Sequence, residues 1–165
     1  SALPEVASAR HRIEHAQIVE PSDVQRFAEL GVVASMQPCH ATSDAPWVEG
    51  RIGSKRLRHA YPWATLAHHG VLLAFGTDAP IEGLDPGPAM ASALARAVVG
   101  ESLAVPAVIH ARTAGAAVAC RAGDWLGRLA LGHRADLTLL ESMPRTPAQW
   151  AGLRVAGRVL DGRPS

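Results

Sequence analysis

Short apolar runs recur along the first half of the chain. Residues 11–19 are rich in β-branched residues, and residues 32–38 and 71–75 are almost continuously apolar. Runs of this length are typical of strands, and a continuous apolar run is typical of a strand that is covered on both faces of a sheet. The pattern therefore predicts three strands of a parallel sheet.

A helix is expected directly after the first strand, over residues 21–31. Ser22 is placed to be its N-cap, Gln25 to complete a capping box three residues later, and Gly31 to end it. A strand, a helix and a second strand in this order form a βαβ unit.

Further helices are expected over residues 56–70, 86–99 and 103–119. In the last of these, Pro106 and residues 113–115 predict breaks. The alternation of strands and helices predicts an α/β architecture with parallel strands.

Residues 39–56 are polar and show no periodicity. We interpret this stretch as a long loop that leaves the second strand. Long ordered loops usually serve a function, so this segment is a candidate to border a site.

The pattern changes near residue 127 to short strands and tight turns. Over residues 155–165, Ala156 and Gly157 have the composition of a hairpin turn. We therefore divide the chain into residues 1–126, an α/β unit, and residues 127–165, a small β segment.

Composition and charge narrow the function classes. The chain has 165 residues, is 48% hydrophobic and has a formal net charge of +1, with no basic block that would indicate nucleic-acid or membrane binding. Cys39 and Cys120 lie far apart, which argues against a disulfide framework and a thiolate zinc site. No apolar stretch is long enough to span a membrane, and we expect a cytoplasmic protein.

Polar side chains follow each of the three predicted strands. His15 ends the first, Gln37 and His40 follow the second, and Asp78 follows the third. In parallel α/β folds the carboxyl ends of the strands share one rim, where ligands bind. Imidazole and carboxylate groups are ligands of Zn²⁺ in hydrolytic sites. His15 and Asp78 are the candidate metal ligands, and Gln37 and His40 the candidate substrate contacts.

Each of these residues also has a purely structural interpretation. A histidine near a strand end, such as His15, is often an ordinary structural residue. Asp78 precedes Ala79 and Pro80 and has the composition of a turn residue. Cys39 lies beside His40, but no further signature supports a nucleophilic cysteine.

Four motifs, in this order, resemble the C-terminal half of the amidohydrolase superfamily: RHRIEHAQ, SMQPCHATSDAPW, AFGTDAP, and GRLALGHRADLTLLE followed by VAGRVLDG. The branch typified by N-substituted formamide deformylase is the most similar. The resemblance implies part of a (β/α)₈ TIM barrel, about its last three β/α units, followed by strands of a small β-sandwich.

The resemblance also implies the roles of individual residues. His15 corresponds to a metal-binding histidine on the sixth barrel strand. Asp78 corresponds to an aspartate on the eighth strand that binds the metal and accepts the proton of the attacking water. The implied cofactor is a divalent metal, zinc, and the implied substrate is a small amide or formamide whose carbon–nitrogen bond is not a peptide bond.

The chain departs from the family in what it lacks. It contains no His-x-His pair, and 165 residues are too few to close a barrel of about 250 residues. We therefore expect the C-terminal portion of a metal-dependent amidohydrolase. The alternative is a catalytically inactive fragment or split-enzyme half, which needs a complementary half-barrel chain or a second copy of itself.

Overall fold

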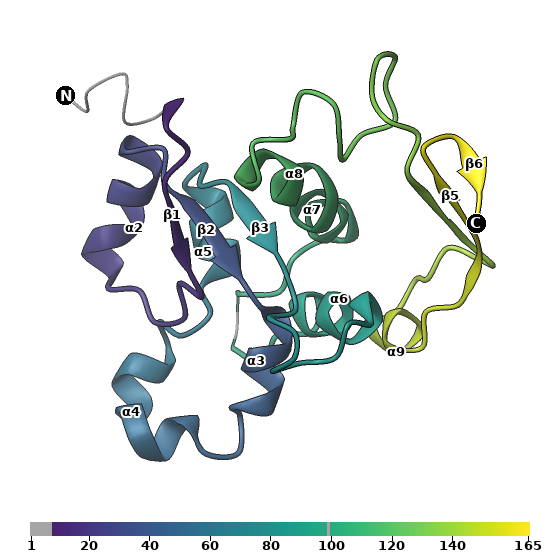
Figure 1. Cartoon of the computed structure of the whole chain (residues 1–165). Helices are drawn as coiled ribbons and strands as arrows, with labels where there is room; N and C mark the ends of the chain where they lie inside the picture. The colour runs from purple at the N-terminus through teal and green to yellow at the C-terminus, as the bar shows by residue number, and fades with distance from the viewer. Residues whose placement is uncertain (1–7, 99) are drawn as a thin grey trace.

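Three short parallel strands form the centre of the fold (Figure 1). The computed structural model describes residues 8–98 and 100–165. The strands β1 (Arg12–Glu14), β2 (Val33–Met36) and β3 (Leu73–Phe75) lie in the order β1-β2-β3 and pair in parallel. The expected parallel sheet is confirmed, although each strand is shorter than its apolar run.

Burial explains why the second and third strands have continuous apolar runs. β3 is buried along its whole length, and β2 is buried except at Ser35. β1, at the edge of the sheet, is exposed at all three positions. This exposure agrees with its mixed polar and apolar sequence.

The helix α2 (Pro21–Glu29) follows β1, as expected, but it begins differently. Its N-cap is Glu20, which makes no side-chain capping bond, so the predicted capping box of Ser22 and Gln25 is wrong. Pro21 occupies the first turn and needs no hydrogen-bond partner there. The Gln25 side chain instead donates to Glu29, and the chain leaves the helix through the left-handed Gly31.

Residues 39–56 are largely helical, so the predicted long loop is wrong. They form most of α3 (Pro38–Ser43) and α4 (Val48–Leu57), with α4 interrupted at Gly53, whose φ is 76°. A helix of six residues is too short to show a periodic pattern and depends on tertiary contacts for its stability. The helix α5 (Trp63–His68) then leads into β3.

In the last long helix the break predicted at Pro106 is wrong, whereas the predicted junction at residues 113–115 falls in a π-helical segment between two α-helices. The helix α6 (Pro86–Leu94) comes first. Further along the chain, α7 (Val105–His110), the π-helical η1 (Ala111–Gly115) and α8 (Ala116–Ala119) follow one another without a gap. Pro106 falls in the first turn, where proline is tolerated. At Gly115 a Cβ atom would lie 2.1 Å from the carbonyl oxygen of Leu73, so only glycine lets the helix approach β3 this closely.

Aromatic side chains from several elements fill the main core. Trp63, Tyr61 and Phe75 are buried, and the Trp63 and Phe75 rings meet edge to face with centroids 6.1 Å apart. The Arg96 guanidinium lies over the Tyr61 ring, 5.2 Å from its centroid. An isolated antiparallel bridge between Ile18 and Ala60 joins the segment between β1 and α2 to this core.

The C-terminal residues form a second, antiparallel sheet with the order β4-β5-β6 (Figure 1). Its strands are β4 (Leu137–Leu140), β5 (Val155–Leu160) and β6 (Arg163–Pro164), and the short helix α9 (Pro147–Ala151) lies between β4 and β5. The predicted hairpin turn is wrong, because Ala156 and Gly157 lie inside β5. The turn is made by Asp161 and Gly162, which both have positive φ.

Among residues 8–98 and 100–165, no helix is both long and apolar enough to cross a membrane. The boundary at residue 127 between two units stays a prediction.

Candidate metal centre

Three side chains meet where the parallel strands end. His15 follows β1, His40 lies in α3 directly after β2, and Asp78 follows β3. One ligand atom from each residue lies within 4.8 Å of the other two. The expected proximity of His15 and Asp78 is confirmed, and His40 joins them.

Two of these residues have a left-handed backbone. The φ angle is 67° at His15 and 58° at Asp78. This conformation is unfavourable by roughly 1–2 kcal/mol for residues with a Cβ atom. Local hydrogen bonds stabilise it, because Ala16 donates to the Glu14 carbonyl and Ile81 donates to the Asp78 carbonyl. Backbone strain of this kind clusters at functional sites.

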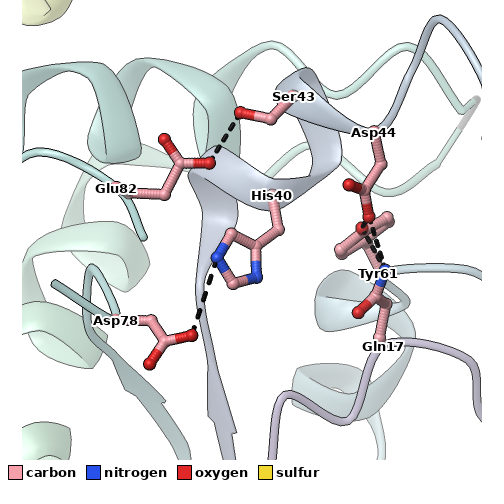
Figure 2. A network of polar contacts seen from close by, with 7 residues as sticks. All are labelled: Gln17, His40, Ser43, Asp44, Tyr61, Asp78 and Glu82. Carbon is pink, nitrogen blue, oxygen red and sulfur yellow. Dashed lines mark hydrogen bonds and ion pairs between the residues drawn. The ribbon is translucent and has the colours of Figure 1, made fainter. Parts of the chain in front are cut away.

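His40 lies between the other two residues. Its ring stacks against that of His15, with centroids 5.7 Å apart and planes 18° apart. Its Nε2 atom lies 3.9 Å from Oδ2 of Asp78 (Figure 2). That nitrogen is buried, and no described residue gives it a hydrogen-bond partner. An unpaired buried imidazole nitrogen is unfavourable by about 1–3 kcal/mol and is available to a ligand.

Gln37 occupies the position before α3 and is only 7% exposed. Its Oε1 atom is buried without a partner among the described residues. Gln37 therefore offers a polar group close to His40 in sequence, and its role as a substrate contact stays a prediction.

The hydrogen bonds of Glu14 are made with Arg12 and Ser35, outside the group of His15, His40 and Asp78. Burial raises the pKa of Glu14, but the hydrogen bonds from Ser35 and Arg12 and the charges of Arg12 and His15 together lower it more, so its net pKa lies below the usual value. Arg12 also donates to the Ala119 carbonyl, which joins β1 to the end of α8. These contacts give Glu14 a structural role.

Cys39 is not activated as a nucleophile. Burial, followed by the nearby charge of Glu82, raises the pKa of the Cys39 thiol above its ordinary value. A reactive cysteine requires the opposite shift, because the thiolate is the reactive form.

The helix α3 is held on both sides by side-chain hydrogen bonds (Figure 2). On one side, Ser43 donates to Glu82 at 2.6 Å, in the loop that begins with Asp78. On the other side, Asp44 accepts hydrogen bonds from Tyr61 and Gln17. The sequence analysis did not identify this second group, and no local pattern links positions so far apart in the chain.

The donor set fits a divalent metal. Two imidazoles and one carboxylate form the protein ligand set of many hydrolytic zinc sites. Bonds of about 2.0–2.1 Å in a tetrahedral arrangement place ligand atoms roughly 3.3 Å apart. Small side-chain rotations would bring atoms within 4.8 Å of one another to that separation. The unpaired Nε2 atom of His40 would then gain a partner.

Comparisons with known proteins agree with this geometry. The sequence profile of the amidohydrolase family matches residues 4–165. The putative amidohydrolase YtcJ of Bacillus subtilis is 34% identical over 169 residues, which cover 94% of this chain and 32% of that protein.

Two solved structures have similar folds. An uncharacterized metal-dependent hydrolase from Pyrococcus furiosus superposes with a TM-score of 0.71 at 39% identity, over 76% of this chain and 27% of that one. An adenosine deaminase from Xanthomonas campestris with bound zinc also has a TM-score of 0.71, at 23% identity, over 93% of this chain and 36% of that one, and shares the fold. The chain thus spans about a third of the length of YtcJ and less than two fifths of either solved chain. Because the family profile covers nearly all of the sequence, the chain belongs to the amidohydrolase family.

Proposed function

We propose that this chain is the C-terminal portion of a metal-dependent amidohydrolase that hydrolyses carbon–nitrogen bonds other than peptide bonds. The single observation that carries the proposal is the convergence of His15, His40 and Asp78, with ligand atoms within 4.8 Å of one another. Membership of the amidohydrolase family supports the reaction class.

In this proposal His15, His40 and Asp78 bind one divalent ion, and zinc is the ion that their chemistry favours. The zinc bound by the Xanthomonas campestris adenosine deaminase, which has a similar fold, supports that choice. A bound ion would lower the pKa of an attacking water and polarise the substrate carbonyl.

Asp78 acts as the general base in this proposal. Its side chain is 39% exposed, so water and substrate can reach its carboxylate. The carboxylate accepts the proton of the attacking water and returns it to the leaving nitrogen, which would otherwise depart as an unstable anion. Gln37 would contact the substrate, and its unpaired buried oxygen suits a donor such as an amide N–H.

The finer substrate class and the architecture are part of the same proposal. The resemblance of the four motifs to the formamide deformylase branch favours N-substituted formamides and related small amides. The α/β unit of residues 1–126 would supply the last three β/α units of a TIM barrel. The sheet of β4, β5 and β6 would belong to a small β-sandwich.

A second candidate function has its own support at the edge of the parallel sheet. β1 is exposed at all three positions, and among the described residues it pairs only with β2. Ile13, in the middle of β1, is 48% exposed. An unpaired strand edge readily accepts another strand. In this alternative the chain is inactive alone and requires a complementary half-barrel chain, or a second copy of itself, to complete the barrel.

Metal analysis combined with an amide hydrolysis assay tests both candidates. For the proposed enzyme, we expect one equivalent of zinc in the purified protein and hydrolysis of N-substituted formamides. His15→Ala should abolish both, whereas His68→Ala, at an exposed histidine of α5, should leave both unchanged. Bound zinc without hydrolysis would favour the alternative of an inactive half barrel. Light scattering would then show whether two copies of the chain associate. A protein that binds no divalent metal would overturn the proposed centre.

A further inference from the structure

We propose that Asp44 is a positioning residue, which acts with Gln17 and Tyr61 to hold His40 at its separation from His15. The role of the two histidines as ligands rests on the proposed function, whereas their spacing does not. We refer to these three residues as the Gln17–Asp44–Tyr61 cluster.

The cluster connects the two segments that carry the histidines. Gln17 lies two residues after His15, and Asp44 lies four residues after His40. The side-chain amide of Gln17 donates to Oδ2 of Asp44 and to the Tyr61 hydroxyl, at 2.5 Å in each case. The Tyr61 hydroxyl donates to the same Asp44 oxygen (Figure 2). One carboxylate oxygen at the end of α3 therefore accepts a hydrogen bond from Gln17, in the segment after β1, and another from Tyr61, just before α5.

Gln17 and Tyr61 are already held together by the backbone. Tyr61 N–H donates to the Gln17 carbonyl at 2.6 Å, and Val19 N–H donates to the His59 carbonyl at 3.2 Å. Tyr61 is 2% exposed, and Arg96 covers its ring. These two residues form a fixed platform on the His15 side, so the Asp44 carboxylate is the link that docks α3 onto it.

The helix that carries His40 needs such a link. α3 has six residues, and its N-cap makes no side-chain hydrogen bond. A helix this short is not stable by itself. Its other side-chain bonds, from Thr42 to Ser92 and from Ser43 to Glu82, lead to α6 and to the loop after Asp78. Among the described residues of this turn, Asp44 is the one whose side chain makes a hydrogen bond toward the His15 side.

Asp44 also controls the direction in which the chain leaves α3. Its N–H donates to the His40 carbonyl at 2.8 Å, which places Asp44 one turn beyond His40. Its carbonyl accepts from the N–H groups of Trp47 and Val48, at the start of α4. The side-chain bonds of Asp44 therefore act directly on the turn that orients the His40 ring.

The hydroxyl of Tyr61 remains a donor throughout the physiological range. Burial, followed by the hydrogen bond to Asp44 and its charge, raises the pKa of Tyr61 above its ordinary value. A neutral hydroxyl that faces a carboxylate acts as the hydrogen-bond donor. The Tyr61 hydroxyl therefore keeps the proton that it donates to Asp44 when the pH is neutral.

The effect on a metal would follow from geometry. Ligands must lie within about 0.5 Å of their productive positions. Partners that orient metal ligands typically change affinity by roughly 10–100-fold when they are removed. Without Asp44, we expect α3 to lose its contact with Gln17 and Tyr61, and the stacked rings of His15 and His40 to separate.

The test compares Asp44→Ala, Asp44→Asn and a matched control, Asp136→Ala. Asp136 is also a partly buried aspartate with two partners, Arg134 and the Asp161 N–H, but it lies in the C-terminal sheet segment. Two quantities are measured in the purified protein: the nuclear Overhauser effect between the His15 and His40 rings without metal, and the dissociation constant of Co²⁺ from its visible absorption.

We expect Asp44→Ala to lose the ring contact and to weaken Co²⁺ binding by roughly 10–100-fold. Asp44→Asn retains an oxygen that accepts both bonds, so it should restore both quantities, and Asp136→Ala should match the unmodified protein. A ring contact and Co²⁺ affinity that survive in Asp44→Ala, or an equal loss in Asp136→Ala, would overturn the inference. If Asp44→Ala does not fold, Tyr61→Phe removes one of the two bonds and should show the same changes more weakly.

These outcomes separate the two proposals. If the unmodified protein does not bind Co²⁺, the proposed metal centre fails. The ring contact between His15 and His40 then decides the present inference without any metal.

Discussion

The Nε2 atom of His40 lies 3.9 Å from an Asp78 oxygen, and no hydrogen bond from the described residues reaches it. A buried imidazole nitrogen in this position is a stronger candidate for a metal ligand than for a substrate contact alone. The two roles make different kinetic predictions.

We therefore predict that His40→Ala weakens Zn²⁺ binding by more than the roughly 10–100-fold that is typical for the loss of a residue that only orients a ligand. The measurement is competition with a chromophoric chelator. His69→Ala, at an exposed histidine after α5, is the matched control and should retain full affinity. If His40 only contacts substrate, the zinc affinity will be unchanged and KM alone will rise.

Asp78→Asn should separate base function from metal binding. The amide keeps an oxygen that can bind an ion, but it cannot accept the proton of water. We expect kcat to fall by about 10²–10⁴-fold while bound zinc is largely retained. Steady-state kinetics and metal analysis of the same preparation check this, and unchanged turnover would reject Asp78 as the base.

The left-handed backbone at Asp78 predicts that glycine is more stable than alanine at this position. Because φ is 58° there, the free energy of unfolding should be about 1–2 kcal/mol higher for Asp78→Gly than for Asp78→Ala. The glycine variant should therefore unfold at a higher urea concentration. Both variants lose the carboxylate, so only the backbone preference differs between them. Equal stabilities would show that residue 78 does not adopt this conformation in solution.

Much of the sheet could be predicted from the sequence, for a physical reason. β2 and β3 are buried, so their residues must be apolar, and continuous apolar runs are visible in the sequence. In a sheet of parallel strands, all carboxyl ends lie at the same edge. The proximity of His15 and Asp78, which follow two of these strands, could therefore also be expected.

The helix α3 could not be predicted in the same way. Six residues carry too little periodicity to indicate a helix, and α3 is held by side chains from distant parts of the chain. The position of His40 next to His15 and Asp78 depends on that helix. The bonds from Gln17 and Tyr61 to Asp44 bridge 27 and 17 positions, respectively, and no sequence pattern records such pairs.

Gly115 should be among the least tolerant positions in the fold. A Cβ atom there would lie 2.1 Å from the backbone oxygen of Leu73, so either η1 or β3 would have to move. Overpacking of this kind destabilises by about 1–3 kcal/mol, and more where only backbone can yield. We expect Gly115→Ala to lower the urea midpoint accordingly.

Gly50→Ala provides the control for this measurement. Gly50 lies in α4, and an added Cβ atom there meets nothing within 4 Å. Alanine is favoured over glycine in a helix by up to about 1 kcal/mol, so this variant should be as stable as the unmodified protein or more stable. Equal destabilisation in both variants would mean that η1 does not pack on β3 as described.

Tyr61 predicts a loss of stability at alkaline pH that can be observed on a single group, because it is the only tyrosine in the sequence. Burial, then the hydrogen bond and charge of Asp44, raise the pKa of its hydroxyl, and the Arg96 charge lowers it by less. In the unfolded chain the hydroxyl ionises near its ordinary pKa of about 10. The folded state holds the proton more tightly, so the contribution to stability is complete below about pH 10 and is lost as the pH rises above that value.

Tyrosinate absorbance near 295 nm should therefore appear near pH 10 in concentrated urea and only at higher pH in the folded protein. Titration near pH 10 in both states would show that the hydroxyl is not buried against Asp44, and Tyr61→Phe should remove the signal altogether.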